Sequence, residues 1–171
     1  MFGRMHDLRR LFDLSREQAG LRSQLAGAVA EFLEAEGLKY HRPKDNVFMV
    51  PVATDAGAWQ VIIHADEQRS FLVVLSSLPV RAGTARRAET AALLNRLNWK
   101  VAIGNFEMDP ADGEIRYRTA VDVEHAPEAA LPLMKHLFGH NVTTVARHWQ
   151  VLVSFLTSDG MSAEEAARQL T

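Results

Sequence analysis

The sequence predicts an α+β fold in which helices cover an antiparallel five-stranded sheet, with the elements in the order α-βββ-α-ββ-α. Two observations lead to this prediction. The strand-like segments form a group of three and a group of two, and the short polar connections within each group favour antiparallel pairing. Segments with helical spacing of apolar residues stand before, between and after these groups, as in α+β domains. A doubly wound nucleotide-binding fold would instead alternate strands and helices.

The first half of the chain supplies one long helix and three strands. Ser15 and Gln18 have the spacing of a capping box, in which each side chain satisfies a backbone N–H of the first helical turn. The apolar stripe that follows predicts a helix over 16–36 that ends at Gly37. The stripe consists of Leu21, Leu25, Val29, Phe32 and Leu33. Strands are predicted at 46–52, 58–65 and 70–80, with a short extended piece before them at 38–41.

The second half supplies a helix, a hairpin and the closing helices. Thr84 is the predicted cap of a helix over 85–98, and strands are predicted at 100–109 and 114–123. Pro127 suits the first position of a short helix that ends at Gly139, because the N–H that proline lacks has no partner there. A stronger amphipathic helix over 142–156 follows.

The ends of the chain are predicted to flank one domain. Leu8, Leu11 and Phe12 recur at helical spacing, so residues 1–14 are expected to form an amphipathic arm or short helix. A single domain is expected over 15–158, and a short terminal helix over 159–171 is predicted from the capping-box pair Ser162 and Glu165.

Composition excludes several classes of function. The net charge is −2 and the basic residues are scattered among acids, whereas a general nucleic-acid binder shows a basic excess or stripe. Cysteine is absent, which excludes a disulfide framework, a thiolate nucleophile and a Cys-ligated metal. The chain has no apolar run of membrane-spanning length and no signal-peptide pattern at its start. We therefore expect a cytoplasmic protein that does not act at a membrane.

The residues that could carry chemistry do not assemble into a known motif. His136 and His140 have the spacing of a helical metal pair, but the segment lacks the glutamate of a zinc protease, and Gly139 is expected to break the helix between them. His148 is expected on an exposed helix surface. No nucleophile, base and orienting group can be combined, so we expect no enzyme, no cofactor and no metal.

The hairpin over 104–123 has a register that can be derived from its side-chain alternation. With the loop at 110–113, Glu107 lies opposite Arg116, Phe106 opposite Tyr117, Met108 opposite Ile115 and Asn105 opposite Arg118. A slip of one residue would set charged side chains against apolar ones. The charges are therefore interpreted first as cross-strand pairs on a solvated face. The alternative is that Arg116 and Arg118 present guanidinium groups to an acidic partner segment.

The helix predicted over 85–98 has a second, small-residue face opposite its apolar one. The apolar face consists of Thr90, Leu93, Leu94 and Leu97. The opposite face consists of Ala88, Ala91, Ala92, Asn95 and Trp99. This second face either accepts another helix of the same chain or forms a dimer or partner surface.

The stretch "LLNRLNWKVAIGNFEMDPADGEIRYRTAVDV" (93–123) resembles the YbjN-domain family of bacterial proteins. Its recurring pattern is an "N-x-L-N" helix end, a strand with "G-x-F-E" and then "DGE-[IV]-R-Y-R-T". These match from Asn95 to Asn98, from Gly104 to Glu107 and from Asp112 to Thr119, and "NVTTVARHWQVLVSFL" (141–156) is similar to the last helix of the family. The resemblance implies a fold like that of type III secretion chaperones and a regulatory, non-enzymatic protein.

The functional hypothesis is a protein-binding adaptor or chaperone-like regulator that forms a homodimer and captures a segment of another protein. The candidate residues are Leu8, Leu11, Phe12, Ala88, Ala91, Ala92, Asn95, Trp99, Arg116 and Arg118. Two alternatives remain open at this stage. A deep pocket with converging polar groups would favour an uncharacterised enzyme, and a contiguous basic groove would favour an accessory factor to a nucleic-acid-binding protein.

Overall fold

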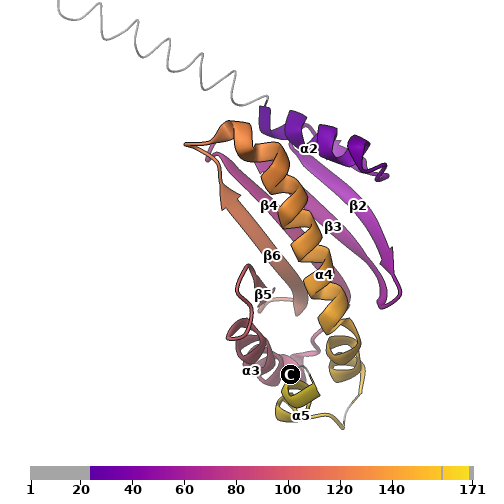
Figure 1. Ribbon diagram of the computed structural model, residues 1–171. Helices are drawn as coiled ribbons and strands as arrows, with labels where there is room; N and C mark the ends of the chain where they lie inside the picture. The colour runs from indigo at the N-terminus through magenta and orange to yellow at the C-terminus, as the bar shows by residue number, and fades with distance from the viewer. Residues whose placement is uncertain (1–23, 159, 170–171) are drawn as a thin grey trace, which may run out of the picture.

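The computed structural model describes residues 24–158 and 160–169, and its centre is a six-stranded antiparallel sheet in the order β1-β2-β3-β4-β6-β5 (Figure 1). The strands are β1 (His41–Lys44), β2 (Val47–Thr54), β3 (Gly57–Asp66), β4 (Phe71–Arg81), β5 (Asn105–Met108) and β6 (Glu114–Asp122). The helices are α2 (Gln24–Ala35), α3 (Arg87–Asn98), α4 (Ala130–Thr157) and α5 (Ala163–Gln169). Short 3-10 turns precede α3 at Thr84–Arg86 and α4 at Pro127–Ala129.

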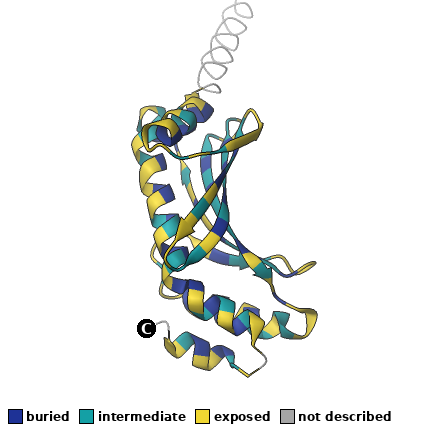
Figure 2. Cartoon of the chain, turned by 90° about the vertical axis from the view of Figure 1, so that its right-hand side faces the viewer, coloured by how far each residue is buried: buried dark blue, intermediate teal, exposed yellow. Residues whose placement is uncertain are grey.

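The helices lie in two places relative to the sheet. Helix α4 runs along β4 and β6, and α2 packs beside α4 and against β3, so both helices cover the same face (Figures 1 and 2). Helices α3 and α5 pack against each other at one end of the sheet, where α3 also contacts β5. The predicted α+β class and the antiparallel pairing are confirmed.

The predicted number of strands is wrong, because the sheet has six strands and not five. The additional strand is β1, which pairs with β2 through His41 opposite Met49 and Lys44 opposite Val47. Its four residues, "HRPK", are all exposed, so they show no alternation between a buried and a solvated face. The sequence indicated only an extended piece at 38–41, a few residues too early.

The predicted break at Gly139 is also wrong, because α4 continues from Ala130 to Thr157. A glycine inside a helix costs about 1 kcal/mol relative to alanine, which packing readily offsets. Here Met134, Phe138 and Val145 are buried on the sheet on both sides of Gly139. Burial of these neighbours therefore decides the continuity of the helix.

Two smaller predictions near α3 and β5 are corrected. Thr84 lies inside the 3-10 turn that precedes α3, and no side chain caps that turn. Strand β5 begins at Asn105 and not at residue 100, because Gly104 has a φ of +80° and turns the chain just before the ladder. This backbone conformation is open to glycine without steric cost.

Asn141 forms a buried polar link between α4 and the middle of the sheet. Its side chain is fully buried, and its amide nitrogen donates to the carbonyl oxygens of Val74 on β4 (3.0 Å) and Tyr117 on β6 (3.2 Å). Its amide oxygen accepts from the Ser76 hydroxyl at 2.5 Å, and Ser76 in turn accepts from Trp59 Nε1 at 2.9 Å. A buried amide with both ends satisfied fixes the rotation and the position of α4 on the strands.

The hairpin of β5 and β6 has the predicted register, with Glu107 opposite Arg116 and Phe106 opposite Tyr117. The loop between the strands is closed by hydrogen bonds from Asp109 N to the Glu114 carbonyl (2.9 Å) and from Gly113 N to the Asp109 carbonyl (2.8 Å).

The loop of this hairpin also packs against β4. Gly113 has a φ of +77°, and a Cβ atom at this position would overlap the carbonyl oxygen of Ala82. The backbone N–H of Ala82 donates to the Gly113 carbonyl oxygen at 2.9 Å. The "DGE" motif therefore combines a turn with a close approach of two backbones.

The outer edge of β5 is occupied by a side chain of α3. Asn98 Nδ2 donates to the Phe106 carbonyl (2.9 Å), and Phe106 N donates to Asn98 Oδ1 (2.7 Å). The side-chain amide of Asn98 thus makes the two hydrogen bonds that a residue of a neighbouring strand would make. It thereby blocks this edge of the sheet at the middle of β5. This contact explains the second asparagine of the "N-x-L-N" motif as a determinant of the fold.

Replacing Asn141 by alanine is expected to destabilise the protein by about 3 kcal/mol, because it leaves a cavity and removes the partner of several buried polar groups. The free energy of unfolding in urea measures this effect. The control is Asn95→Ala, at an exposed position on α3, for which we expect a change below about 0.5 kcal/mol. Equal effects of the two substitutions would contradict the assigned role of Asn141.

A second buried polar contact joins the β3–β4 turn to α2. Ala26 N donates to Glu67 Oε1 at 3.0 Å, whereas Oε2 has no hydrogen-bond partner among the described residues. Burial raises the pKa of the Glu67 carboxyl above its ordinary value, and the hydrogen bond from Ala26 opposes this only in part.

Glu67→Gln is expected to change how stability depends on pH. The folded chain binds the Glu67 proton more tightly than the unfolded chain, so this contribution to stability is present below the unfolded pKa and is lost as pH rises through the folded pKa. Glutamine retains an accepting oxygen and does not titrate, so the stability of the variant relative to wild type should increase with pH over this window and then stay constant. Urea unfolding at a series of pH values measures the difference, and a difference independent of pH would contradict the prediction.

Candidate functional site

Helix α3 carries the two faces that the sequence predicts. Its inner residues, Thr90, Leu93, Leu94 and Leu97, are buried. Its outer residues, Ala88, Ala91, Ala92 and Asn95, are exposed, and so is Trp99 at its C-terminal end. Trp99 is 91% exposed, the highest value among the large hydrophobic side chains described. Its indole therefore leaves most of its apolar area outside the core that the described residues form.

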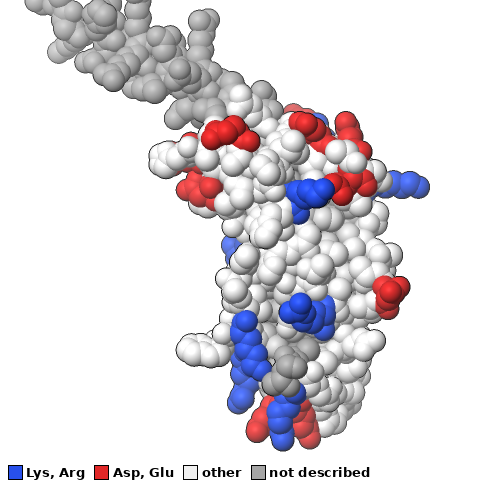
Figure 3. All heavy atoms as spheres, in the orientation of Figure 1, with Lys and Arg blue, Asp and Glu red and all other residues white. Residues whose placement is uncertain are grey.

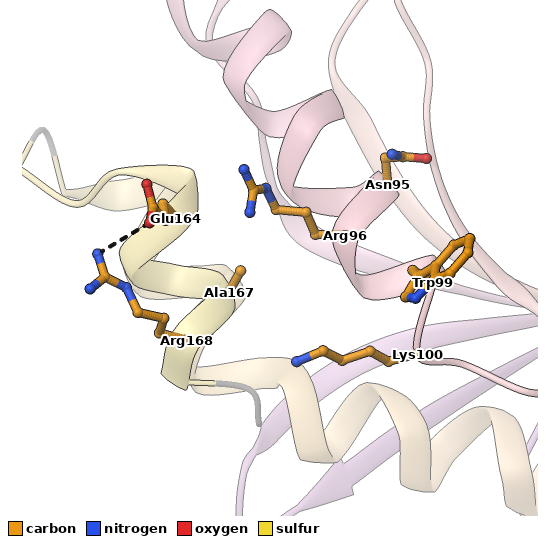
Figure 4. Close-up of a pocket in the computed structure, with 7 residues that line it drawn as sticks. All are labelled: Asn95, Arg96, Trp99, Lys100, Glu164, Ala167 and Arg168. Atoms are coloured by element: carbon orange, nitrogen blue, oxygen red, sulfur yellow. Dashed lines mark ion pairs between the residues drawn. The ribbon is translucent and has the colours of Figure 1, made fainter.

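A hollow of about 410 Å³ lies between the end of α3 and α5, next to Trp99 (Figure 4). Its lining consists of Asn95, Arg96, Trp99, Lys100, Glu164, Ala167 and Arg168. Within it, Arg168 pairs with Glu164 across one turn of α5 at 3.8 Å. Helix α5 contacts α3 near both ends, since the Ala163 amide donates to Glu89 in the first turn of α3 at 3.0 Å, and the exposed alanines of the outer face stay uncovered by the described residues.

The face of the sheet that points away from α2 and α4 is not covered by any helix of the described residues (Figure 2). Strand register aligns its side chains in rows across β2, β3, β4 and β6. One row is Met49, Ile62, Leu75 and Arg118, and the next is Val47, His64, Val73 and Ala120. Apart from Ala120, which is exposed, the apolar members of these rows are half-buried by one another and not by a second layer. We refer to these two rows as the open sheet face.

Arg116 and Arg118 lie on β6 at the side of the open sheet face. Both are bound to one carboxylate: Arg116 pairs with Glu107 at 3.1 Å, and Arg118 pairs with the other oxygen of Glu107. The predicted cross-strand pair of Glu107 and Arg116 is confirmed, and Arg118 joins it diagonally. Two guanidinium groups share one carboxylate here, so the cluster keeps an excess positive charge at the rim of the face.

The open sheet face was not found by reasoning from the sequence, although a signal was present. The strands contain continuous apolar runs such as "VFMV", "VII" and "FLVVL". A strand with one solvated face should alternate, whereas a continuous run predicts burial on both faces. The described helices bury only one face, so these runs leave an apolar surface on the other.

The histidines differ from their predicted settings. His136 and His140 lie on the continuous helix α4 with their ring centroids 6.4 Å apart. No group of three or more residues suited to hold a metal ion occurs among the described residues. His148 is only 8% exposed and packs its ring edge-on against Phe106, which corrects the expectation of a solvated side chain. Positions 141, 145, 148 and 152 share one face of α4, and this face is the buried one.

The environment of His148 disfavours its protonation. Burial lowers the pKa of its imidazole, and the bond from Nδ1–H to the Thr144 carbonyl (2.8 Å) opposes this only partly.

The remaining candidates, Leu8, Leu11 and Phe12, lie outside the described residues. None of the helices in the described part of the chain is both long and apolar enough to cross a membrane.

Residues 26–131 match the family model YbjN, described as "Putative bacterial sensory transduction regulator". The chain belongs to the YbjN family. The match includes the hairpin and the Asn98 contact, and it ends near the start of α4. No curated protein matches the sequence.

Three solved structures share the fold at low sequence identity. The crystal structure of YbjN from E. coli has a TM-score of 0.52 at 9% identity, over 74% of this chain and 90% of that one. A chain of the HopA1–SchA chaperone–effector complex has a TM-score of 0.50 at 14% identity, over 75% and 94%. A chain of the ExsC–ExsE complex has a TM-score of 0.51 at 18% identity, over 76% and 93%. The similarity to these three structures, all below 25% identity, is established for the fold alone.

Proposed function

We propose that this protein is a non-enzymatic adaptor or chaperone-like regulator of the bacterial cytoplasm, which forms a homodimer and binds a segment of a partner protein. The observation that carries the proposal is the open sheet face, where apolar side chains of β2, β3 and β4 have no covering layer among the described residues. Contiguous exposed apolar surface of this kind is typical of a protein-binding site. The fold shared with a chain of a chaperone–effector complex supports the same function.

The partner is proposed to lie across the open sheet face and not along an edge of the sheet. At one edge, the Asn98 amide occupies the backbone groups of Phe106 in β5. At the other edge, β1 is four exposed residues long and contains Pro43, which has no N–H to donate. Strand addition needs free backbone groups, whereas Met49, Ile62 and Leu75 offer side-chain contacts.

Charge at the rim would orient the partner. Arg116 and Arg118 share the single carboxylate of Glu107, so an acidic residue of the partner segment would complete the pairing. Exposed charges of this type contribute more to specificity and to the association rate than to affinity. The apolar rows would therefore supply the affinity, and the arginines would set the direction of the bound segment.

The homodimer is proposed to form through the outer face of α3. Ala88, Ala91 and Ala92 permit close approach of a second helix, and a two-fold axis would place the same face on both subunits. Trp99 of each subunit would then lie against the hollow beside Asn95 of the other. This arrangement would bury Trp99, the most exposed large hydrophobic side chain among the described residues.

Trp99→Asp is expected to convert the homodimer into a monomer, because it places a charge at the centre of the proposed contact. Light scattering at tens of micromolar protein measures the mass, and an unchanged melting temperature shows that the fold is retained. Ala53→Asp, at an exposed position on β2, is the matched control and should leave a dimer. A monomeric mass for the wild-type protein would contradict the proposed dimer.

Leu75→Thr is expected to abolish partner capture without loss of the fold, because threonine suits a strand but removes apolar area from the middle row. Affinity purification with mass spectrometry would identify the partner, and direct binding to the purified partner would then be measured for each variant. Val151→Thr, at a half-buried position on α4, is the control and should bind normally. Equal affinities of the Leu75 variant and wild type would remove the open sheet face from the proposal.

A further inference from the structure

A second hollow, of about 500 Å³, lies between α4, the loop that follows α3 and the end of α5. Its lining consists of Lys100, Val101, Ala102, His140, Thr144, Arg147, His148 and Gln169. The volume is within the ~300–1,000 Å³ that is usual for small-molecule sites. Lys100 also lines the hollow beside Trp99, but the other residues belong to this one alone.

Hydrogen bonds hold the walls of this hollow in place. The carbonyl oxygen of Ile103 accepts hydrogen bonds from the Tyr117 hydroxyl and from His140 Nε2 (3.1 Å), which anchor the loop to β6 and α4. On the opposite wall, His148 Nδ1–H is bound to the Thr144 carbonyl. A site with walls fixed in this way binds a ligand without a large ordering cost.

The charged groups of the lining are all basic. Lys100 and Arg147 are exposed, neither forms an ion pair with a described residue, and no carboxylate of the described residues lines the hollow. On the face shown in Figure 3, Lys and Arg side chains are more numerous towards the end of the molecule that contains α3 and α5, where some acidic side chains also lie, and acidic side chains are more numerous at the other end. Unpaired cations at a concave surface attract anions and raise their local concentration.

The geometry points to a binding site for a small anionic molecule, an oxyanion joined to a compact apolar body. Arg147 offers a planar fork of N–H donors that matches the oxygens of a phosphate or carboxylate, and Lys100 adds a second charge from the opposite wall. Val101 and Ala102 supply apolar surface for the body of the ligand. This proposal does not depend on the protein-binding function, because it concerns different side chains and a different class of ligand.

The same hollow is not arranged for catalysis by His140 and Thr144. The Thr144 hydroxyl is 3.4 Å from His140 Nε2, a contact that would resemble an activated nucleophile. However, Nε2 carries the proton that is donated to the Ile103 carbonyl, because a carbonyl oxygen only accepts. This nitrogen therefore cannot act as the base for Thr144, and the chemistry of the site is binding.

The test uses the full chain, labelled with ¹⁵N, in a buffer of low ionic strength. Phenyl phosphate and benzoate are titrated as the phosphate and carboxylate probes, and benzyl alcohol is titrated as the neutral probe. We expect saturable shifts for at least one anion, centred on the amides of 100–102 and 144–148, and none for benzyl alcohol. The anion with the lower dissociation constant identifies the preferred oxyanion.

Two variants and one control decide between a specific site and general attraction. Arg147→Gln and Lys100→Gln should each raise the dissociation constant about tenfold, the effect of losing one charged hydrogen bond. Lys135→Gln, on the same helix but paired with Glu36, should leave it unchanged. The proposal is overturned by an absence of saturation at millimolar anion, or by equal weakening in the Lys135 variant.

Discussion

The buried amide of Asn141 is the contact on which the arrangement of the two layers depends. Helix α4 presents apolar side chains to the sheet over its whole length, and apolar contacts alone tolerate small shifts and rotations. Asn141 removes this tolerance, because its amide must meet Val74 on one strand and Tyr117 on the next at the same time. Any shift of the helix would leave buried polar groups without partners, which costs more than the shift could gain.

The position of α4 has a consequence for the other side of the sheet. Together, α2 and α4 cover one face, and the described part of the chain has no helix for the opposite one. Strands β2, β3 and β4 nevertheless carry apolar side chains on both faces, as strands with cover on both sides do. The proposed partner segment would provide the missing layer. The apolar side chains on the uncovered face would then be explained by burial in the complex and not by burial in the isolated chain.

Several of the residues that identify the family serve the fold. Asn98 occupies the edge of β5, Gly104 turns the chain before it, and Gly113 permits the contact with Ala82. The proposed binding surfaces use Arg116 and Arg118 of the family motif, but otherwise depend on positions outside it, such as Trp99 at the end of α3 and Arg147 on α4. A family pattern built on fold determinants predicts the shape of a relative well and its ligand poorly.

Local patterns in the sequence were sufficient to predict the α+β class, the antiparallel pairing and the hairpin register, because side-chain alternation together with a loop at 110–113 sets the pairing of 105–108 with 115–118. They were insufficient where distant segments decide the outcome. Gly139 predicts the end of a helix, but the helix continues through it because neighbouring residues are buried on the sheet. His148 was expected to be solvated, but its ring lies against Phe106. The open sheet face likewise depends on which face α4 covers, and that choice is made by contacts between residues far apart in the chain.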